Sequence, residues 1–229
     1  MNKREFDKFA DEYQALHSAN IAVSGEAPEY FAEYKIRDLK NLLTPDFDTG
    51  RFLDFGAGLG NSVSFFRKYF PVAELTCVDV SLKSLELGVA KHGGHANFVA
   101  FDGLRLPFGD AMFDCVFAAC VFHHIPLPLH LSLFAEMRRV LRPDGCLMVY
   151  EHNPLNPLTV RSVDTCEFDE NAILIRAGTL RARIAAAGFI RAGIRYRVFF
   201  PRSLRWLRPL ESRLTWLPFG AQYYVYANR

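Results

Sequence analysis

From residue 51 onward the chain alternates short apolar runs with helical patterns, and this alternation restricts its fold more than any other feature. Strands are expected at 51–56, 74–80, 96–102, 112–122 and 146–152, and helices at 61–70, 81–91 and 129–141. The strands are rich in Val, Phe, Leu and Cys, as in a parallel sheet that is covered on both faces. Regular strand–helix alternation indicates right-handed βαβ units, so we predict an α/β fold with a doubly wound, mostly parallel sheet.

The last part of the chain departs from this alternation. A helix is expected at 179–187, followed by strand-like runs at 190–200 and 221–227, with a proline-punctuated stretch at 201–220 in place of a helical crossover. Two successive strands without a crossover indicate an antiparallel hairpin at the edge of a seven-stranded sheet. At 229 residues we expect a single domain, with an N-terminal helical cap at 1–50, a core at 51–229 and substrate-side insertions at 153–178 and 201–220.

Composition is typical of a folded cytoplasmic protein. Half of the residues are hydrophobic, and no apolar run approaches the roughly 18 residues needed to span a bilayer. The formal net charge of +2 gives by itself no reason to expect a nucleic-acid partner. The five cysteines form no CxxC pair and no zinc-like spacing, so no metal site is expected. Cys77, Cys115 and Cys120 lie in apolar runs and are interpreted as buried free thiols.

Positive charge is concentrated near the carboxyl end of the chain. Residues 176–213 hold ten arginines and a single acid, Glu211. This asymmetry favours an anionic substrate or surface, although a solvated arginine-rich face explains it equally well. Within 201–218, five leucines recur at spacings of three and four, with Trp206, Trp216 and arginines between them. Such a segment predicts peripheral membrane contact, and the alternative is that its leucine stripe packs on the domain.

The residues between the first strand and the first helix carry the clearest functional signal. Residues 53–61 read LDFGAGLGN, with glycines at 56, 58 and 60 and an acid, Asp54, two residues before the first glycine. A dinucleotide-binding loop has the spacing GxGxxG, but position 61 is asparagine rather than glycine. An acid beside the loop disfavours a phosphate, so the loop suits a ligand that carries an ammonium and a sulfonium group. The alternative is that the glycines only join strand to helix.

Two further acids end the next two expected strands. Asp79 is placed where a carboxylate can accept hydrogen bonds from a ribose diol, and Asp102 where one can accept from the exocyclic amine of an adenine. Both acids also have a structural alternative. Asp79 could cap the following helix together with Ser81, and Asp102 could cap a turn before Gly103.

Three acids at successive strand ends, together with the GxGxG loop, resemble the class I S-adenosylmethionine-dependent methyltransferases. The segments FDCVF at 113–117, HHIP at 123–126 and EMRRVLRPDG at 136–145 are similar to the UbiE-like, or type 11, branch. The resemblance covers residues 50–152 closely. It implies the Rossmann-like strand order 3-2-1-4-5-7-6 with strand 7 antiparallel, and S-adenosyl-L-methionine as the cofactor. The candidate cofactor-binding residues are Asp54, Gly56, Ala57, Gly58, Gly60, Asn61, Asp79, Val80, Asp102, Gly103, Cys120 and Tyr13.

The acceptor is expected near the ends of the fourth and fifth strands, where His123, His124 and His152 lie. Imidazole is a natural base near neutral pH, so His123 and His124 are our candidates for a catalytic base, ahead of His152; a structural role is the alternative. The segment after strand four differs from the proline-rich signature of nucleic-acid and protein amine methyltransferases. We therefore predict methyl transfer to a small-molecule or glycan- or lipid-linked acceptor, at oxygen. The alternatives are an NAD(P)-dependent oxidoreductase and a cofactor-binding protein without catalytic activity.

Overall fold

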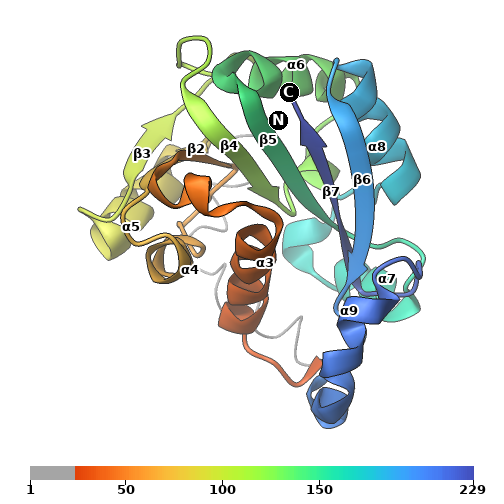
Figure 1. The fold of residues 1–229 in the computed structure, drawn as a ribbon. Coiled ribbons are helices and arrows are strands. Elements are labelled where there is room, and N and C mark those ends of the chain that lie inside the picture. The colour runs from red at the N-terminus through yellow and green to blue at the C-terminus, as the bar shows by residue number, and fades with distance from the viewer. Residues whose placement is uncertain (1–23) are drawn as a thin grey trace.

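A computed structural model describes residues 24–229 and shows seven strands in one sheet (Figure 1). The strand order is β3-β2-β1-β4-β5-β7-β6, and every neighbouring pair is parallel except those of β7, which is antiparallel to β5 and β6. This confirms the predicted fold class and the antiparallel edge pair. The strands are β1 Arg51–Phe55, β2 Glu74–Asp79, β3 Asn97–Ala100, β4 Phe113–Ala119, β5 Leu141–His152, β6 Ile190–Arg197 and β7 Gln222–Asn228.

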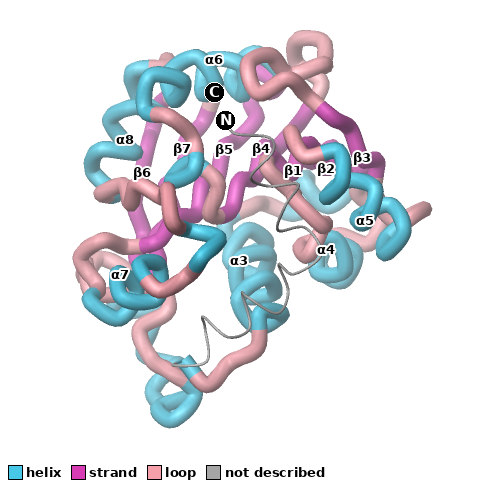
Figure 2. Tube along the Cα trace, turned by 180° about the vertical axis from the view of Figure 1, so that it is seen from behind, coloured by secondary structure: helices cyan, strands magenta, loops and turns pink. Residues whose placement is uncertain are grey.

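Helices cover both faces of the sheet, as Figures 1 and 2 show. One core cluster joins side chains of α6 and α8 to Leu53 of β1, and a second joins side chains of α3 and α4 to the neighbouring Phe52. Neighbouring residues of β1 thus face opposite layers, which explains why the central strands are mostly apolar on both faces. The helices are α3 Pro28–Leu42, α4 Val63–Tyr69, α5 Leu82–His92, α6 His130–Val140, α7 Pro157–Asp164, α8 Ala177–Ala186 and α9 Glu211–Leu214.

The fourth strand is shorter than the sequence predicts. β4 ends at Ala119, whereas 112–122 was expected, and the short 3₁₀-helix η3 (Phe122–His124) follows. The cause lies in β5, where the Glu151 carboxylate accepts hydrogen bonds from the backbone N–H groups of Val121 and Phe122 at 3.1 and 2.7 Å. These bonds draw the chain away from the sheet, so Cys120 lies beyond the strand with φ of 58°.

Two segments for which the sequence gave weak signals contain short helices. Residues 153–178 hold α7 and the 3₁₀-helix η5 (Glu167–Asp169), and residues 201–220 hold the 3₁₀-helix η6 (Arg202–Leu210) and α9. The latter segment joins two antiparallel neighbours, so it is no crossover, as predicted. Short 3₁₀-helices η2 (Pro45–Thr49) and η4 (Leu127–Leu129) complete the described elements. Among residues 24–229, no helix combines the length and the apolar character that crossing a membrane requires.

Candidate cofactor and acceptor site

The glycine loop leaves β1 and is fixed to β2. The backbone N–H groups of Gly56 and Ala57 donate to the carbonyl of Val78 at 2.8 and 3.2 Å. Gly56, Gly58 and Gly60 all have positive φ, a conformation that glycine adopts without strain. A Cβ at Gly56 or Gly60 would press on Val121 or Phe98, whereas a Cβ at Gly58 would meet no atom of the described residues within 4 Å.

Gly58 therefore faces open space beside the carboxyl ends of the central strands. Packing among residues 24–229 does not require a glycine there; its positive φ favours one, and the open space also lets a ligand approach the backbone closely. The open backbone at Gly58 is the local feature that best fits the cofactor implied by the sequence.

Asp79 connects this loop to the end of β2. Its carboxylate accepts hydrogen bonds from the N–H of Gly58 at 2.8 Å and from the N–H of Ser81 at 2.9 Å. The hydroxyl of Ser81, rather than Asp79, caps α5 by accepting from the N–H of Ser84. The carboxylate thus holds the loop in its open conformation, next to the place where a ribose contact was predicted.

Asp54 is buried behind the loop. The hydroxyl of Ser62 donates to its carboxylate. Burial raises the pKa of Asp54 to about 7, the negative charge of Asp79 adds to this rise, and the hydrogen bond from Ser62 and the charge of Lys35 oppose it. A cationic group near Asp54 would stabilise its charged form, as the predicted ammonium ligand would.

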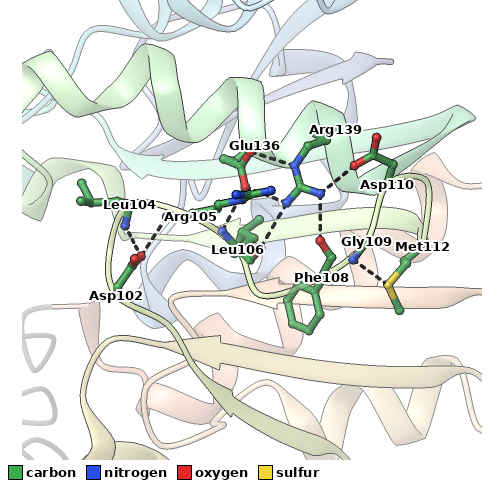
Figure 3. Close-up of polar contacts among 10 residues, drawn as sticks. All are labelled: Asp102, Leu104, Arg105, Leu106, Phe108, Gly109, Asp110, Met112, Glu136 and Arg139. Atoms are coloured by element: carbon green, nitrogen blue, oxygen red, sulfur yellow. Dashed lines mark hydrogen bonds and ion pairs between the residues drawn. The ribbon is translucent and has the colours of Figure 1, made fainter.

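Asp102 follows β3 and is exposed. One of its oxygens accepts hydrogen bonds from the N–H groups of Leu104 and Arg105, both at 2.8 Å, as Figure 3 shows. These two bonds lower the pKa of Asp102. The turn-capping alternative is therefore observed, and the adenine contact stays a prediction.

Arg139 of α6 holds the loop that follows Asp102. Its guanidinium donates to the carbonyls of Leu106 and Phe108 at 3.1 and 2.8 Å and to the Asp110 carboxylate at 2.8 Å (Figure 3). It also forms a two-bond ion pair with Glu136, which in turn accepts from the N–H of Leu106. Arg139, which the sequence analysis did not identify, thus fixes the loop that is expected to border the adenine.

The remaining candidate residues lie in different surroundings. The side chain of Val80 is packed in the core, Gly103 has a positive φ of 86°, and the Asn61 amide oxygen accepts from Lys91 at 3.4 Å. Tyr13 lies outside the described residues.

Cys120 differs from the buried thiol that the sequence suggested. It follows β4, and the ammonium group of Lys35, from α3, lies 3.2 Å from its sulfur. Burial raises the pKa of the Cys120 thiol, but the charges of Lys35 and His152 outweigh this effect and lower it to about 6. The amide of Gln222 lies 3.9 Å from the same sulfur, and its buried oxygen has no hydrogen-bond partner in the described part of the chain. Cys120 is thus a free thiol, as interpreted from the sequence, but it is half-buried rather than buried.

The two candidate bases lie in a polar cluster at the ends of β4 and β5. His123 Nδ1 lies 2.6 Å from the buried Glu151 carboxylate, and Asp169 Oδ1 lies 3.6 Å from His123 Nε2 and 3.3 Å from His124 Nε2. The ring of His152 lies 5.1 Å from that of His123. The structure thus brings the histidines together with Asp169, which has no sequence signal because it belongs to a distant and irregular segment.

The two histidines differ in their protonation. Burial acts to lower the pKa of His123, but the charge of Glu151 and the hydrogen bonds to Asp169 and Glu151 raise it to about 10. Burial lowers the pKa of His124, with Asp169 opposing this effect. Near neutral pH His123 is therefore a cation and His124 is neutral.

This cluster also has the composition of a cation site. One atom from each of His123, His124 and Asp169 lies within 4.8 Å of the others, and within residues 24–229 this is the sole group of three such side chains. Imidazole nitrogens and carboxylate oxygens are ligands of divalent transition metals. The sequence contains no metal-binding motif, but the fold brings together three side chains that could bind a cation.

Comparisons with known proteins agree with this geometry. Residues 53–149 match the methyltransferase domain family. The UbiE ubiquinone/menaquinone biosynthesis C-methyltransferase of Hahella chejuensis is 31% identical over 123 residues, which cover 51% of this chain and 49% of that protein. The malonyl-[acyl-carrier protein] O-methyltransferase of Legionella pneumophila is 28% identical over 165 residues, covering 71% of this chain and 52% of that protein. This chain therefore spans about half the length of these two relatives.

The fold has counterparts among solved structures. An S-adenosylmethionine-dependent methyltransferase from Thermotoga maritima superposes with a TM-score of 0.70 at 19% identity, covering 98% of both chains. This likeness concerns the fold alone, whereas the sequence match includes the glycine loop, Asp79 and Asp102. Residues 53–149 thus match the methyltransferase domain family and are similar in sequence to UbiE, as the resemblance to the type 11 branch implied, and they lie in a fold that S-adenosylmethionine-dependent methyltransferases share.

Proposed function

We propose that this chain transfers a methyl group to an oxygen of a small-molecule or glycan- or lipid-linked acceptor in the cytoplasm. S-adenosyl-L-methionine, when bound, supplies a methyl group made electrophilic by its sulfonium charge. The open backbone at Gly58, braced by Asp79, is where the chain would hold this cofactor. The nicotinamide alternative is set aside, because residues 53–149 match the methyltransferase domain.

The relatives do not decide which atom is methylated. By their names, UbiE is a C-methyltransferase and the Legionella pneumophila protein an O-methyltransferase. The observation that supports oxygen in this chain is the contact between His124 and Asp169. A hydroxyl acceptor loses a proton during methyl transfer, and a neutral imidazole oriented by a carboxylate is suited to take it.

The cluster assigns different tasks to the two histidines. Glu151 and Asp169 hold His123 as a cation. An imidazolium has no free nitrogen lone pair, so His123 cannot accept a proton from the acceptor. If Asp169 accepts the Nε2 proton of His124, the basic nitrogen of that ring is Nδ1. We therefore take His124 as the catalytic base, Asp169 as the residue that positions it and His123 as part of its support.

The test is a methyl-transfer assay with isotope-labelled S-adenosylmethionine and cell extracts divided into water-soluble and lipid fractions. We expect an O-methylated product, identified by mass spectrometry, and a loss of 100-fold or more in kcat for His124→Gln. Binding of S-adenosylhomocysteine should be unchanged in that variant. The exposed His95→Gln is the matched control and should retain full activity.

Three results would change the proposal. A product methylated at carbon would contradict the oxygen assignment. Cofactor binding without turnover in any fraction would favour a binding protein without catalytic activity. Loss of activity on treatment with EDTA, restored by a divalent cation, would show that His124 and Asp169 act as metal ligands and not as a base with its positioning residue.

A further inference from the structure

Residues 201–220 form a lobe at one end of the sheet, and this lobe leaves large apolar side chains in water. Trp206 and Trp216 are each 71% exposed, Phe219 is 66% exposed, and no residue of η6 is buried. Two leucines of the stripe, Leu204 and Leu210, are 40% and 45% exposed, whereas the other three are half-buried. Scattered exposed apolar residues are ordinary, but so many within twenty residues mark an interaction surface.

A second exposed segment adjoins this lobe. The side-chain amide of Asn156 donates to the carbonyl of Phe219 at 2.8 Å, and the amide of Asn153 donates to the carbonyls of Pro218 and Gly220. Leu155 and Leu158, which flank Asn156, are 47% and 63% exposed. Figure 1 shows α7 and α9 together at this end of the molecule. The apolar surface thus extends from the lobe onto the start of α7.

The polar contacts of the lobe are made on its inner side. Glu211, its only acid, is buried and accepts hydrogen bonds from the Tyr34 hydroxyl and from the N–H groups of Phe199 and Phe200. Arg208 pairs with Glu26 at 2.7 Å and stacks on Tyr30. The outward side therefore carries no acid.

The exposed charged side chains of the lobe at 201–220 are all positive. Arg202, Arg205 and Arg213 are exposed around the tryptophans. Tryptophan rings between arginines match the interface of an anionic lipid bilayer, where indole and guanidinium groups meet headgroups and phosphates. A protein partner would have to supply a matching acidic surface, whereas an anionic bilayer has that charge everywhere.

We propose that the lobe at 201–220, with Leu155 and Leu158, docks the protein on an anionic lipid surface. In the sheet, His152 at the end of β5 pairs with Gln222 at the start of β7, so the lobe lies at the same sheet edge as the carboxyl ends of β1, β4 and β5. Docking would bring this edge, with the histidine cluster, to the membrane. The inference concerns binding and does not depend on the proposed O-methylation.

The chain provides its own reporter, because Trp206 and Trp216 are its only tryptophans. We expect their fluorescence to shift to shorter wavelength on titration with phosphatidylglycerol–phosphatidylcholine vesicles, and to shift little with phosphatidylcholine alone. The double variant Arg202→Ser/Arg205→Ser should reduce partitioning about 25-fold. The control Val72→Ser changes a residue that is 68% exposed away from the lobe and should leave partitioning unchanged.

Each other outcome contradicts the inference. Equal partitioning to neutral and anionic vesicles would remove the role of the arginines. Absence of any shift with anionic vesicles would overturn the proposal, and so would a concentration-dependent dimer in sedimentation experiments that Trp206→Ser abolishes, because a second copy would then be the occupant. In all cases S-adenosylhomocysteine binding by the arginine variant should match the unchanged chain, which separates this test from that of methyl transfer.

Discussion

At the scale of single residues, the pair formed by His123 and Glu151 controls the pH dependence of stability. The folded chain raises the pKa of His123 from 6.5 to about 10, so it binds this proton more tightly than the unfolded chain does. The resulting stabilisation is fully present below pH 6.5 and is lost as the pH rises toward 10. We expect a decrease on the order of 4 kcal/mol in the free energy of unfolding over that range.

Urea denaturation between pH 6 and 10 measures this contribution. His123→Gln should be less stable at pH 6 and should lose much of the slope, whereas the exposed His95→Gln should follow the unchanged chain. Parallel pH curves for the unchanged chain and His123→Gln would contradict the view that a buried imidazolium lies between Glu151 and Asp169.

The sequence predicted individual site residues where a motif fixes their spacing. Gly58 and Asp79 are joined by a hydrogen bond at the predicted place, because a strand–loop–helix unit defines their geometry locally. Lys35 and Asp169 were missed, since each reaches the site from a segment without a motif. The pKa of Cys120 was also unpredictable, because it depends on Lys35 from α3 and His152 from β5.

At the scale of elements, Arg139 should control the loop that follows β3. The guanidinium is the main side-chain link between α6 and residues 106–110. We expect Arg139→Ala to lower the free energy of unfolding by about 2 kcal/mol, because charged hydrogen bonds to backbone carbonyls are lost. It should also weaken S-adenosylhomocysteine binding, because the loop borders the expected adenine pocket.

The neighbouring Arg138 offers a matched control. Its side chain donates a hydrogen bond to the carbonyl of Gly188 at 3.0 Å, and Arg138→Ala should leave cofactor binding unchanged. Calorimetry would compare the S-adenosylhomocysteine affinity of the two variants, and urea denaturation would compare their free energies of unfolding. Equal effects of the two substitutions on S-adenosylhomocysteine affinity would contradict a special role for Arg139.

Regular elements were predicted well because their hydrophobic pattern is local. The seven strands and the antiparallel edge follow from apolar runs and from the missing crossover between β6 and β7. Two boundaries required tertiary information: β4 ends early because Glu151 of β5 binds its following amides, and β5 begins at Leu141 rather than at 146. The short helices of 153–178 have no clear periodicity, whereas the leucines within 201–218 recur at helical spacings of three and four.

At the scale of the whole molecule, a buried ion pair joins α3 to the edge strand β6. Arg197 of β6 donates two hydrogen bonds of 2.6 Å to Asp38 of α3, and the hydroxyl of Tyr150 donates to the same carboxylate. Removing one partner of a buried pair leaves the other charge unpaired. We expect Asp38→Ala to lower the free energy of unfolding by about 3–5 kcal/mol.

A double variant separates the pair from simple loss of packing. Asp38→Leu/Arg197→Met removes both charges and should recover much of the stability lost in Asp38→Ala, as judged by urea denaturation. Lys68→Met breaks the exposed pair with Glu33 and should change stability by less than about 1 kcal/mol. A double variant as unstable as Asp38→Ala would show that the unpaired charge of Arg197 is not the cause of the lost stability.

The central claim is that S-adenosylmethionine binds over the open backbone at Gly58. Gly58 and Gly94 both have positive φ, and no atom of residues 24–229 lies near the Cβ position of either, so an alanine strains the backbone at both sites, but Gly94 lies in the turn before β3. Calorimetric titration with S-adenosylhomocysteine should show saturable binding that Gly58→Ala weakens at least tenfold and Gly94→Ala leaves unchanged. No saturable binding by the unchanged chain, or equal affinity in the two variants, would contradict the account.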